Sequence, residues 1–370
     1  MKVAIDARAV TEHPSGVGVY TRTLISALAE YDGRNSYCVM ANHRLPFPQN
    51  FPANIQVIDD AFPIGNLWLQ IKCPALLRKN KIDVFHGANF LAPLFAPCPT
   101  VLTVHDLSSY IYPHMHTARN NLVQRLLPAA IRRAALVIAI SESTKRDLIE
   151  RMTVPEAKIR VVHNAIRSGF VRVDDASVLA RAKERYRLPD RFFLFVGTLE
   201  PRKNIPRLLD AFVRFLRNTN NGASLLLAGD HGWGAREVLE HHGRLGLGER
   251  ARFLGYVEHD DLPALYTLAR AAIMPSIYEG FGLPAVEAMA CGTPLIAANN
   301  SALTEVVGDG ALCFPFEDVA RLAELMTALD RDDDLHARYA TKGFERAKAF
   351  SAATFARATL DVYREVVEQQ

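Results

Sequence analysis

Short apolar runs alternate with longer amphipathic stretches along the whole chain. The short runs are rich in Val, Ile, Leu and Phe, which is the composition of strands that are buried on both faces of a parallel sheet. The stretches between them place apolar residues at helical spacing. This alternation predicts an α/β protein built from consecutive βα units.

The pattern divides into two series of strands. In the first half, strands are expected at 2–6, 36–41, 55–59, 83–87, 100–105, 136–140 and 159–163, and helices at 17–30, 65–79, 117–134 and 142–151. In the second half, strands are expected at 192–196, 224–228, 252–254, 271–275, 294–298 and 311–314, and helices at 205–216, 235–245, 260–269, 284–290 and 318–329. Two more helices are predicted at 335–349 and 352–368, beyond the last strand.

A chain of 370 residues exceeds what one hydrophobic core usually supports, so two domains are expected. The charged stretch 166–191 separates the two strand series, and we place the connection between domains there. This divides the chain into an N-terminal domain over 1–170, a C-terminal domain over 171–350 and a terminal helix over 351–370.

The most informative segment is 279–287, which reads Glu-Gly-Phe-Gly-Leu-Pro-Ala-Val-Glu. Pro284 suits the start of a helix that begins near Leu283, so Glu279 should lie in the preceding loop and Glu287 one turn inside the helix. The free N–H groups of the helix start favour a phosphate, and the glycines let a ligand approach the backbone. A carboxylate beside this anion seat suits hydroxyl groups. The expected ligand therefore carries both, as a nucleotide sugar does.

A second candidate loop follows the apolar run 192–196, where Gly197 leads into Thr198-Leu199-Glu200-Pro201-Arg202-Lys203-Asn204. Ligands bind beyond the carboxyl ends of the strands in parallel sheets, and here that position carries two adjacent cations. Lys203 would supply a mobile point charge to a diphosphate, and Arg202 a bidentate grip. The alternative is a solvated Arg–Lys pair on a surface loop. We expect the loops around positions 203 and 280 to meet at one site.

The first half carries weaker signals. Gly16 and Gly18 follow the first strand, where glycines can form a tight turn or let a ligand approach the backbone. They are not the dinucleotide-binding fingerprint, because Thr21 occupies the position where that pattern has glycine or alanine. His105 ends the strand 100–105, where a structural histidine is the ordinary alternative. In the second half, Tyr256 and Val257 follow a strand and could line a base pocket or simply form a turn.

Five segments together resemble the retaining glycosyltransferases of family 4, in that family's order. Glu279 and Glu287 match its E-x7-E signature, and the stretch 195–204 is similar to its donor-phosphate loop. The other three segments are Val161-Val162-His163-Asn164-Ala165, Ser15-Gly16-Val17-Gly18-Val19-Tyr20 and Val104-His105-Asp106-Leu107. The resemblance covers essentially the whole chain. It implies the GT-B architecture, in which two Rossmann-like domains face each other across a cleft and the last helix returns to the first domain.

The resemblance also implies roles for individual residues. Glu279 would accept hydrogen bonds from donor-sugar hydroxyls, Glu287 would reach the ribose, and His105 would face the donor sugar. Backbone near Phe281, Gly282 and Leu283 would hold the sugar and the β-phosphate, with Thr198, Gly16, Gly18, Tyr256 and Val257 as further donor-binding positions. Where many family members carry an arginine after the glycine of the phosphate loop, this chain has Thr198. Phosphate neutralisation then rests on Arg202, Lys203 and backbone N–H groups.

The expected reaction is transfer of a hexose, with retention and without a metal or cofactor, from a nucleoside diphosphate sugar. The acceptor would be a saccharide or a lipid-linked saccharide in cell-surface polysaccharide synthesis. A loose likeness to O-antigen mannosyltransferases makes GDP-mannose the first choice of donor. A GT-B sugar-nucleotide epimerase or hydrolase is the alternative, and a Rossmann dehydrogenase a distant one. No nucleic acid is expected as a partner.

Charge and cysteine content add information on location. Residues 1–170 hold 19 Lys and Arg against 12 Asp and Glu, while the whole chain has a net charge of only +3. A basic first domain favours contact with an anionic membrane, although chance variation between two solvated surfaces explains it equally simply. The five scattered cysteines favour free thiols in a reducing compartment, and neither a signal peptide nor a long apolar run is evident. A cytoplasmic protein is expected, at or near the inner face of the cell membrane.

Overall fold

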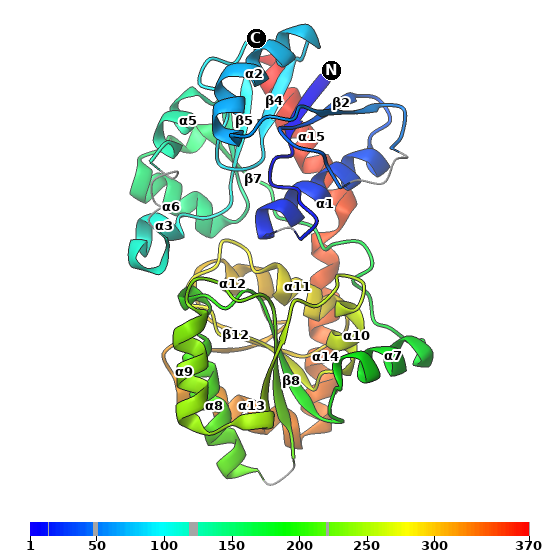
Figure 1. The fold of residues 1–370 in the computed structure, drawn as a ribbon, viewed down its shortest axis with the longest axis vertical. Coiled ribbons are helices and arrows are strands. Elements are labelled where there is room, and N and C mark those ends of the chain that lie inside the picture. The colour runs from blue at the N-terminus through cyan, green and yellow to red at the C-terminus, as the bar shows by residue number, and fades with distance from the viewer. Residues whose placement is uncertain (14, 47–50, 118–124, 220–221, 370) are drawn as a thin grey trace. The chain divides into compact units, whose positions relative to one another are not determined.

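A computed structural model describes residues 1–13, 15–46, 51–117, 125–219 and 222–369. The chain divides into two compact units, shown in Figure 1. Unit 1 consists of Met1–Arg167 together with Phe350–Gln370, and unit 2 is the continuous segment Ser168–Ala349. The last helix therefore belongs to the same unit as the first strand.

Unit 1 is built on a seven-stranded parallel sheet in the order β3-β2-β1-β4-β5-β6-β7. The strands are β1 (Lys2–Asp6), β2 (Ser36–Ala41), β3 (Ile55–Asp59), β4 (Val84–Gly87), β5 (Thr100–Val104), β6 (Leu136–Ala139) and β7 (Ile159–Val161). Its helices are α1 (Gly16–Tyr31), α2 (Gly65–Lys79), α3 (Ser108–Ile111), α5 (Leu127–Arg133), α6 (Glu142–Met152) and α15 (Ala352–Glu368).

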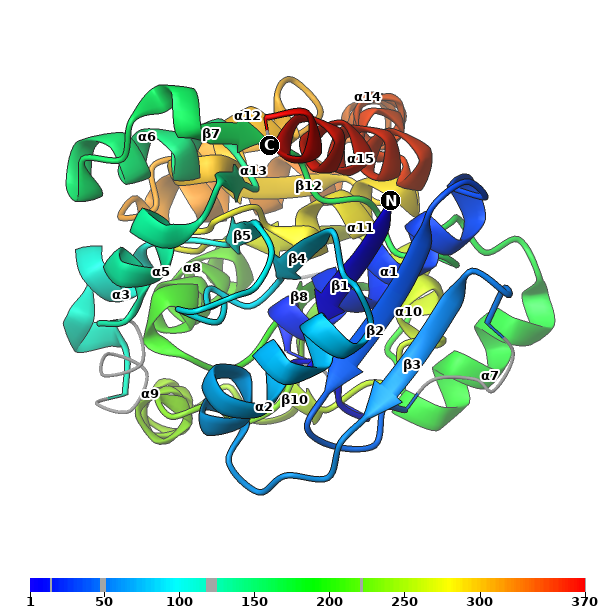
Figure 2. The ribbon, with the colours of Figure 1, turned by 90° about the horizontal axis from the view of Figure 1, so that it is seen from above.

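Helices cover both faces of this sheet, which is why its central strands β1, β4, β5 and β6 are almost entirely buried. Figure 2 shows α2 on one side of the strands and α1 with α15 on the other. Because successive side chains point to opposite faces, Phe85 and Leu102 join the core that includes Trp68 of α2. Their neighbours His86 and Thr103 instead face α1 and α15.

Unit 2 has a six-stranded parallel sheet in the order β10-β9-β8-β11-β12-β13. The strands are β8 (Phe192–Val196), β9 (Ser224–Ala228), β10 (Ala251–Gly255), β11 (Ala271–Met274), β12 (Leu295–Ala298) and β13 (Leu312–Phe314). The helices are α7 (Ala176–Tyr186), α8 (Ile205–Asn218), α9 (Ala235–Leu245), α10 (Leu262–Leu268), α11 (Leu283–Ala290), α12 (Ser301–Val307), α13 (Val319–Arg331) and α14 (Asp333–Ala347). Within the unit, α8 packs against α9 and α13, and α11 packs against α10 and α14 (Figure 1).

The strand predictions are confirmed, each within two residues at either end. Three helices were missed: α3, α7 and α12. Unit 1 ends and unit 2 begins within the stretch 166–191, which also contains an 11-residue helix that was not predicted, α7. Asp175 caps this helix, which packs against α10. The predicted helix 117–134 falls partly on residues outside the described ranges, and its described part forms α5. No helix in the described part of the chain is long and apolar enough to span a bilayer.

A row of buried polar side chains joins α15 to the centre of unit 1. The Nδ1 of His86 lies 2.6 Å from the hydroxyl of Tyr363, and its Nε2 lies 2.7 Å from Oγ1 of Thr103. Thr103 Oγ1 in turn lies 3.0 Å from the hydroxyl of Tyr20 in α1. Each buried polar group thus has a partner, and the row fixes α15 against β4 and β5.

We expect acid to destabilise unit 1 through His86. Burial, with a smaller contribution from the nearby His105, lowers the pKa of His86 from 6.5 to about 3 in the folded protein. As the pH falls below 6.5, the unfolded chain therefore binds a proton that the folded chain does not. The free energy of unfolding should then decrease by about 1.4 kcal/mol per pH unit from this group alone.

The fluorescence of Trp68, which is buried in unit 1, provides the measurement in a Trp233→Phe background. Urea unfolding at several pH values between about 7 and 5 gives the free energy of unfolding as a function of pH. The slope of that free energy against pH should be smaller in the His86→Asn variant, by the equivalent of about one proton. Equal slopes in the two proteins would contradict the assignment.

Candidate active site

In unit 2, the strand order changes direction at β8. This strand lies between β9, which follows it in the chain, and β11, which comes much later. The chain therefore leaves β8 and β11 toward opposite faces of the sheet. The loops that follow these two neighbouring strands meet at the carboxyl edge of the sheet. Ligands of open parallel sheets bind at such a switch point.

The loop after β8 is fixed to the loop after β11 by its backbone and by Asn204. The amide N–H of Ile277 donates to the carbonyl of Arg202 at 2.8 Å. Asn204 has a left-handed backbone, with φ of 59°, and its side-chain amide donates to the carbonyls of Pro275 and Phe316. Arg202 and Lys203 lie in the short 3-10 turn between these anchors, directly before α8.

The carboxylate of Glu279 lies between the two cations of the loop after β8. Its Oε1 accepts from Lys203 Nζ at 2.7 Å, and its Oε2 accepts from Arg202 Nη1 at 2.7 Å. Both Lys203 and Glu279 are buried, with 8% and 6% of their surface exposed. The two predicted loops thus contact each other directly, and the alternative of a solvated Arg–Lys pair is wrong.

The electrostatics of this cluster keep Glu279 ionised. Burial alone would raise its pKa, but Arg202 and Lys203 outweigh burial and lower the pKa from 4.5 to about 2. Oε1 also accepts from Ser276 Oγ at 2.6 Å. A carboxylate has about four lone-pair positions, so Oε2 keeps room for one more donor.

Several residues of this cluster were not predicted from the sequence. Glu200 accepts from Arg202 Nη2 at 2.7 Å, Ser276 donates to Glu279, and Ser301 accepts from the Glu279 amide at 2.9 Å. Asn300 donates to the carbonyls of Ser276 and Ile277. Glu200 belongs to the loop that the sequence singles out. Asn300 and Ser301 come together with Glu279 only because their strands are neighbours in the sheet, and no local sequence pattern indicates these two residues or Ser276.

The helix after Glu279 begins as predicted, because α11 starts at Leu283 with Pro284 in its first turn. Gly282 has φ of 91°, and a Cβ there would lie 2.6 Å from Cδ2 of Leu303, so only glycine fits. Phe281 is buried beside it. Glu287 is only 1% exposed, which excludes the ordinary interpretation of a solvent-facing helix glutamate.

Three other candidates lie at the same edge of the unit 2 sheet. Thr198 is exposed and follows Gly197, while Tyr256 and Val257 follow β10. Hydrogen bonds connect these loops, since Gly229 donates to the carbonyl of Gly255 and Gly197 donates to that of Ala228. Tyr256 is 39% exposed and Val257 is buried, so of the two Tyr256 offers the accessible surface.

The candidates of unit 1 lie at the carboxyl edge of its own sheet, where the order switches between β1 and β4. The helix that was predicted over 17–30 begins one residue earlier, at Gly16, so Gly16 and Gly18 both lie in the first turn of α1. A Cβ at Gly16 would meet nothing within 4 Å, so crowding does not explain that glycine. Neither glycine makes the separate tight turn that was considered.

His105 follows β5 and is buried against Tyr20 and Phe90, with ring centroids 4.7 and 5.2 Å away. Burial lowers its pKa, so the ring is neutral near pH 7. Nε2 lies 2.8 Å from the carbonyl of Ala88, and because a carbonyl can only accept, Nε2 carries the hydrogen. The other nitrogen, Nδ1, therefore keeps its lone pair. Asp106 Oδ1 accepts from the backbone N–H and the hydroxyl of Ser108, the first residue of α3.

Among the residues that the structure describes, no group of three or more His, Cys, Asp or Glu could hold a metal ion. All five cysteines lie in described segments and are free thiols.

Two protein families match the chain in consecutive segments. Residues 14–169 match Glycosyltransferase Family 4, and residues 179–346 match Glycosyl transferases group 1. The first match corresponds to most of unit 1 and the second lies within unit 2.

Curated relatives include the Escherichia coli O-antigen chain mannosyltransferase B, which is 33% identical over 291 residues, 78% of this chain and 76% of that protein. The serotype-specific mannosyltransferase WbdA of Escherichia coli is 28% identical over 76% of this chain, which spans only about a third (36%) of its length. Glycogen synthase of Mycobacterium tuberculosis is 32% identical over 78% of this chain and 68% of that protein.

Solved structures show the same fold. The sucrose-phosphate synthase of Thermosynechococcus elongatus superposes with a TM-score of 0.78 over 100% of both chains, at 22% identity. Anabaena HepE, solved with UDP and glucose, gives 0.76 over 99% of this chain and 100% of its own, also at 22% identity. The two matched segments, the mannosyltransferase relative and these structures together show that the chain belongs to the family 4 glycosyltransferases, resembles bacterial mannosyltransferases and has the GT-B architecture.

Proposed function

We propose that this glycosyltransferase moves mannose, with retention, from GDP-mannose to a saccharide or lipid-linked saccharide in cell-surface polysaccharide synthesis. One observation carries the proposal: Arg202 and Lys203 converge on Glu279 at the switch point of the unit 2 sheet. Two cations and a carboxylate at one edge match a ligand with a diphosphate and hydroxyl groups.

The two cations would hold the donor diphosphate. An ammonium group has three hydrogens, and Lys203 commits one of them to Glu279, so the others are available to a phosphate oxygen. The amino-terminal end of α11, beside Gly282, adds backbone N–H groups and the positive end of a helix dipole. As the nucleoside diphosphate leaves, these groups stabilise the charge that develops on the β-phosphate.

Glu279 then has two tasks. It holds Arg202 and Lys203 in position, and its remaining lone pair on Oε2 accepts one hydroxyl of the donor sugar. Glu287, one turn inside α11, is assigned to the ribose hydroxyls. In unit 1, the neutral ring of His105 is assigned to a donor-sugar hydroxyl through Nδ1, because Nε2 is held by Ala88. Gly16 and Gly18 present the backbone of α1 to the donor.

Retention would follow without a covalent intermediate. Glu279 is a poor nucleophile, since its pKa is about 2 and both of its oxygens accept hydrogen bonds from cations. The double displacement of retaining glycosidases needs a second, free carboxylate. We therefore propose attack of the acceptor on the face that the diphosphate leaves, with the leaving phosphate taking the acceptor's proton. Arg202 and Lys203 supply the positive charge that a metal supplies elsewhere, so no metal is required.

The choice of mannose as the sugar and guanine as the base is based on the similar proteins. The Escherichia coli mannosyltransferase favours mannose, and glycogen synthase at nearly the same identity makes glucose the competing sugar. The UDP complex of HepE makes uracil the competing base.

Unit 1 also offers a surface for peripheral membrane contact, in keeping with a cytoplasmic enzyme at the inner face of the membrane. Ile64, the N-cap of α2, and Leu67 and Ile71 in the helix are spaced three and four residues apart and are 57%, 42% and 60% exposed. Gln70 connects this helix to the loop that carries Phe95, which is 71% exposed and lies under Arg133. Exposed apolar side chains among cations suit an anionic bilayer surface.

Replacing Lys203 with Ala should lower turnover by roughly two to three orders of magnitude, the scale of losing one group that stabilises the developing oxyanion. Glu279→Ala should have a comparable effect, because it leaves both cations without their anchor. Initial rates of transfer, measured in excess EDTA, provide the test, and the exposed Lys342→Ala is the matched control. A Lys203→Ala enzyme with near-wild-type rates would remove that residue from the mechanism.

Donor binding should raise the melting temperature by mass action, so a thermal-shift panel can identify the base and the sugar. We expect GDP and GDP-mannose to stabilise the protein more than UDP, ADP and UDP-glucose do, and Lys203→Ala to abolish the difference. A larger shift with UDP-glucose would replace mannose by glucose in the proposal.

Vesicle flotation tests the membrane surface. At low salt, the protein should float with vesicles that contain anionic lipid, and Leu67→Ser/Ile71→Ser should remain at the bottom of the gradient. Val171→Ser, at an apolar position of unit 2 that is 62% exposed, is the control. If the wild-type protein stays at the bottom of the gradient with anionic vesicles at low salt, the proposed membrane contact is wrong.

A further inference from the structure

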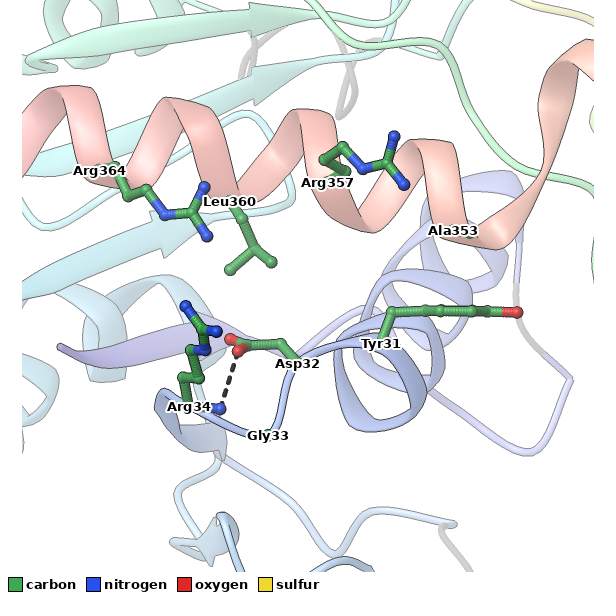
Figure 3. Close-up of a pocket in the computed structure, with 8 residues that line it drawn as sticks. All are labelled: Tyr31, Asp32, Gly33, Arg34, Ala353, Arg357, Leu360 and Arg364. Atoms are coloured by element: carbon green, nitrogen blue, oxygen red, sulfur yellow. Dashed lines mark hydrogen bonds between the residues drawn. The ribbon is translucent and has the colours of Figure 1, made fainter.

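A second pocket lies in unit 1, away from the carboxyl edge that carries Gly16 and His105. It has a volume of about 350 Å³ and is lined by Tyr31, Asp32, Gly33, Arg34, Ala353, Arg357, Leu360 and Arg364 (Figure 3). The loop on one side joins the end of α1 to the start of β2. The pocket is therefore at the amino edge of the sheet, where the proposed transfer reaction has no group.

Three arginines surround this pocket. Arg34 comes from the loop, and Arg357 and Arg364 come from α15. In Figure 3, Arg34 points from the loop toward α15, while Arg364 and Leu360 point from α15 toward the loop. All three arginines are exposed, so their guanidinium groups are accessible to a ligand.

The carboxylates nearby pair with only one of these three cations in the described part of the chain. Asp32 Oδ1 accepts from the backbone N–H of Arg34 at 3.0 Å, and Oδ2 accepts from Asn35 Nδ2 at 2.7 Å and from the hydroxyl of Tyr37. These bonds fix Asp32 to the turn before β2, so it serves the loop itself. Arg364 pairs with Asp361 on its own helix, at 2.8 Å.

Arg34 and Arg357 have no such partner. Within the part of the chain that the structure describes, neither side chain makes a hydrogen bond or an ion pair with another residue. Like charges that line one concavity repel each other unless an anion lies between them. Guanidinium groups bind phosphate oxygens in pairs, which makes phosphate the anion that suits them best.

The remaining walls favour an organic phosphate over the bare ion. Tyr31 is 49% exposed and Leu360 points into the same space, so one side of the pocket is apolar. The volume falls in the range of small-molecule sites, roughly 300–1,000 Å³. We propose that this pocket binds the phosphate group of a small soluble molecule such as a sugar phosphate or a nucleoside monophosphate, at a site separate from the donor.

Hydrogen exchange measured by mass spectrometry on the full chain tests this locally, because the donor site belongs to other peptides. We expect glucose 6-phosphate or AMP to slow amide exchange in segments 31–36 and 353–364, with inorganic phosphate acting more weakly and sodium chloride of equal ionic strength not at all. Arg34→Gln/Arg364→Gln should weaken the apparent affinity at least about tenfold. Arg78→Gln, an exposed arginine of α2 outside the pocket, should bind as the wild type does.

The proposal is overturned if chloride slows exchange as much as the phosphates do, if the double variant keeps the effect, or if none of the probes has one. Vesicles of anionic phospholipid form a further arm. Slowing by vesicles alone would assign the phosphate to a lipid headgroup and overturn a soluble ligand. Unchanged exchange in peptides of unit 1 that lie outside the pocket, such as those of β4 and β5, shows that the double variant is folded, and Arg357→Gln replaces it if it is not.

Discussion

The ion cluster of Glu279, Arg202 and Lys203 holds the functional part of unit 2 together. It links two loops that are 76 residues apart in the chain, and they can meet only because β8 and β11 are neighbours in the sheet. Removing the carboxylate would leave the buried ammonium of Lys203 without its counter-charge, which is far more costly than losing a surface ion pair, while Arg202 would keep its contact with Glu200. The charges that join the two loops are also of the kind that would bind a diphosphate. The architecture of the sheet and the chemistry of the site are thus parts of one arrangement.

The sequence predicted the strands well because a strand buried on both faces is a short apolar run that ends at polar or glycine residues. Short helices such as α3 and α12 were missed, since a segment of one or two turns has too few residues to show a period. The helix α7 was missed because it is rich in charged residues, and Ala182 is its only buried residue. Strand order had no local signal at all, because pairing between β8 and β11 is a property of the whole sheet.

The candidate site shows the same division. Motif spacing found Glu279, Lys203 and Arg202, and the start of α11 at Leu283 followed from Pro284. Ser276, Asn300 and Ser301 escaped notice because they act through hydrogen bonds between segments that only the fold brings together. The burial of Glu287 was likewise invisible in a sequence where a helix glutamate is most often solvated. The motifs therefore indicated which residues come together, and the fold shows which residues hold them in place.

The position of α15 has a consequence for how the molecule is made. Unit 2 is one continuous segment, whereas unit 1 needs both ends of the chain, with Tyr363 bonded to His86 in the interior of its sheet. During translation, the ribosome exposes every residue of unit 2 before the last helix of unit 1 has emerged. Unit 2 can thus complete its structure while the chain is still attached, but unit 1 lacks the contacts that α15 makes with its sheet until residues 352–368 have emerged. The N-terminal half is synthesised before unit 2 and completed after it.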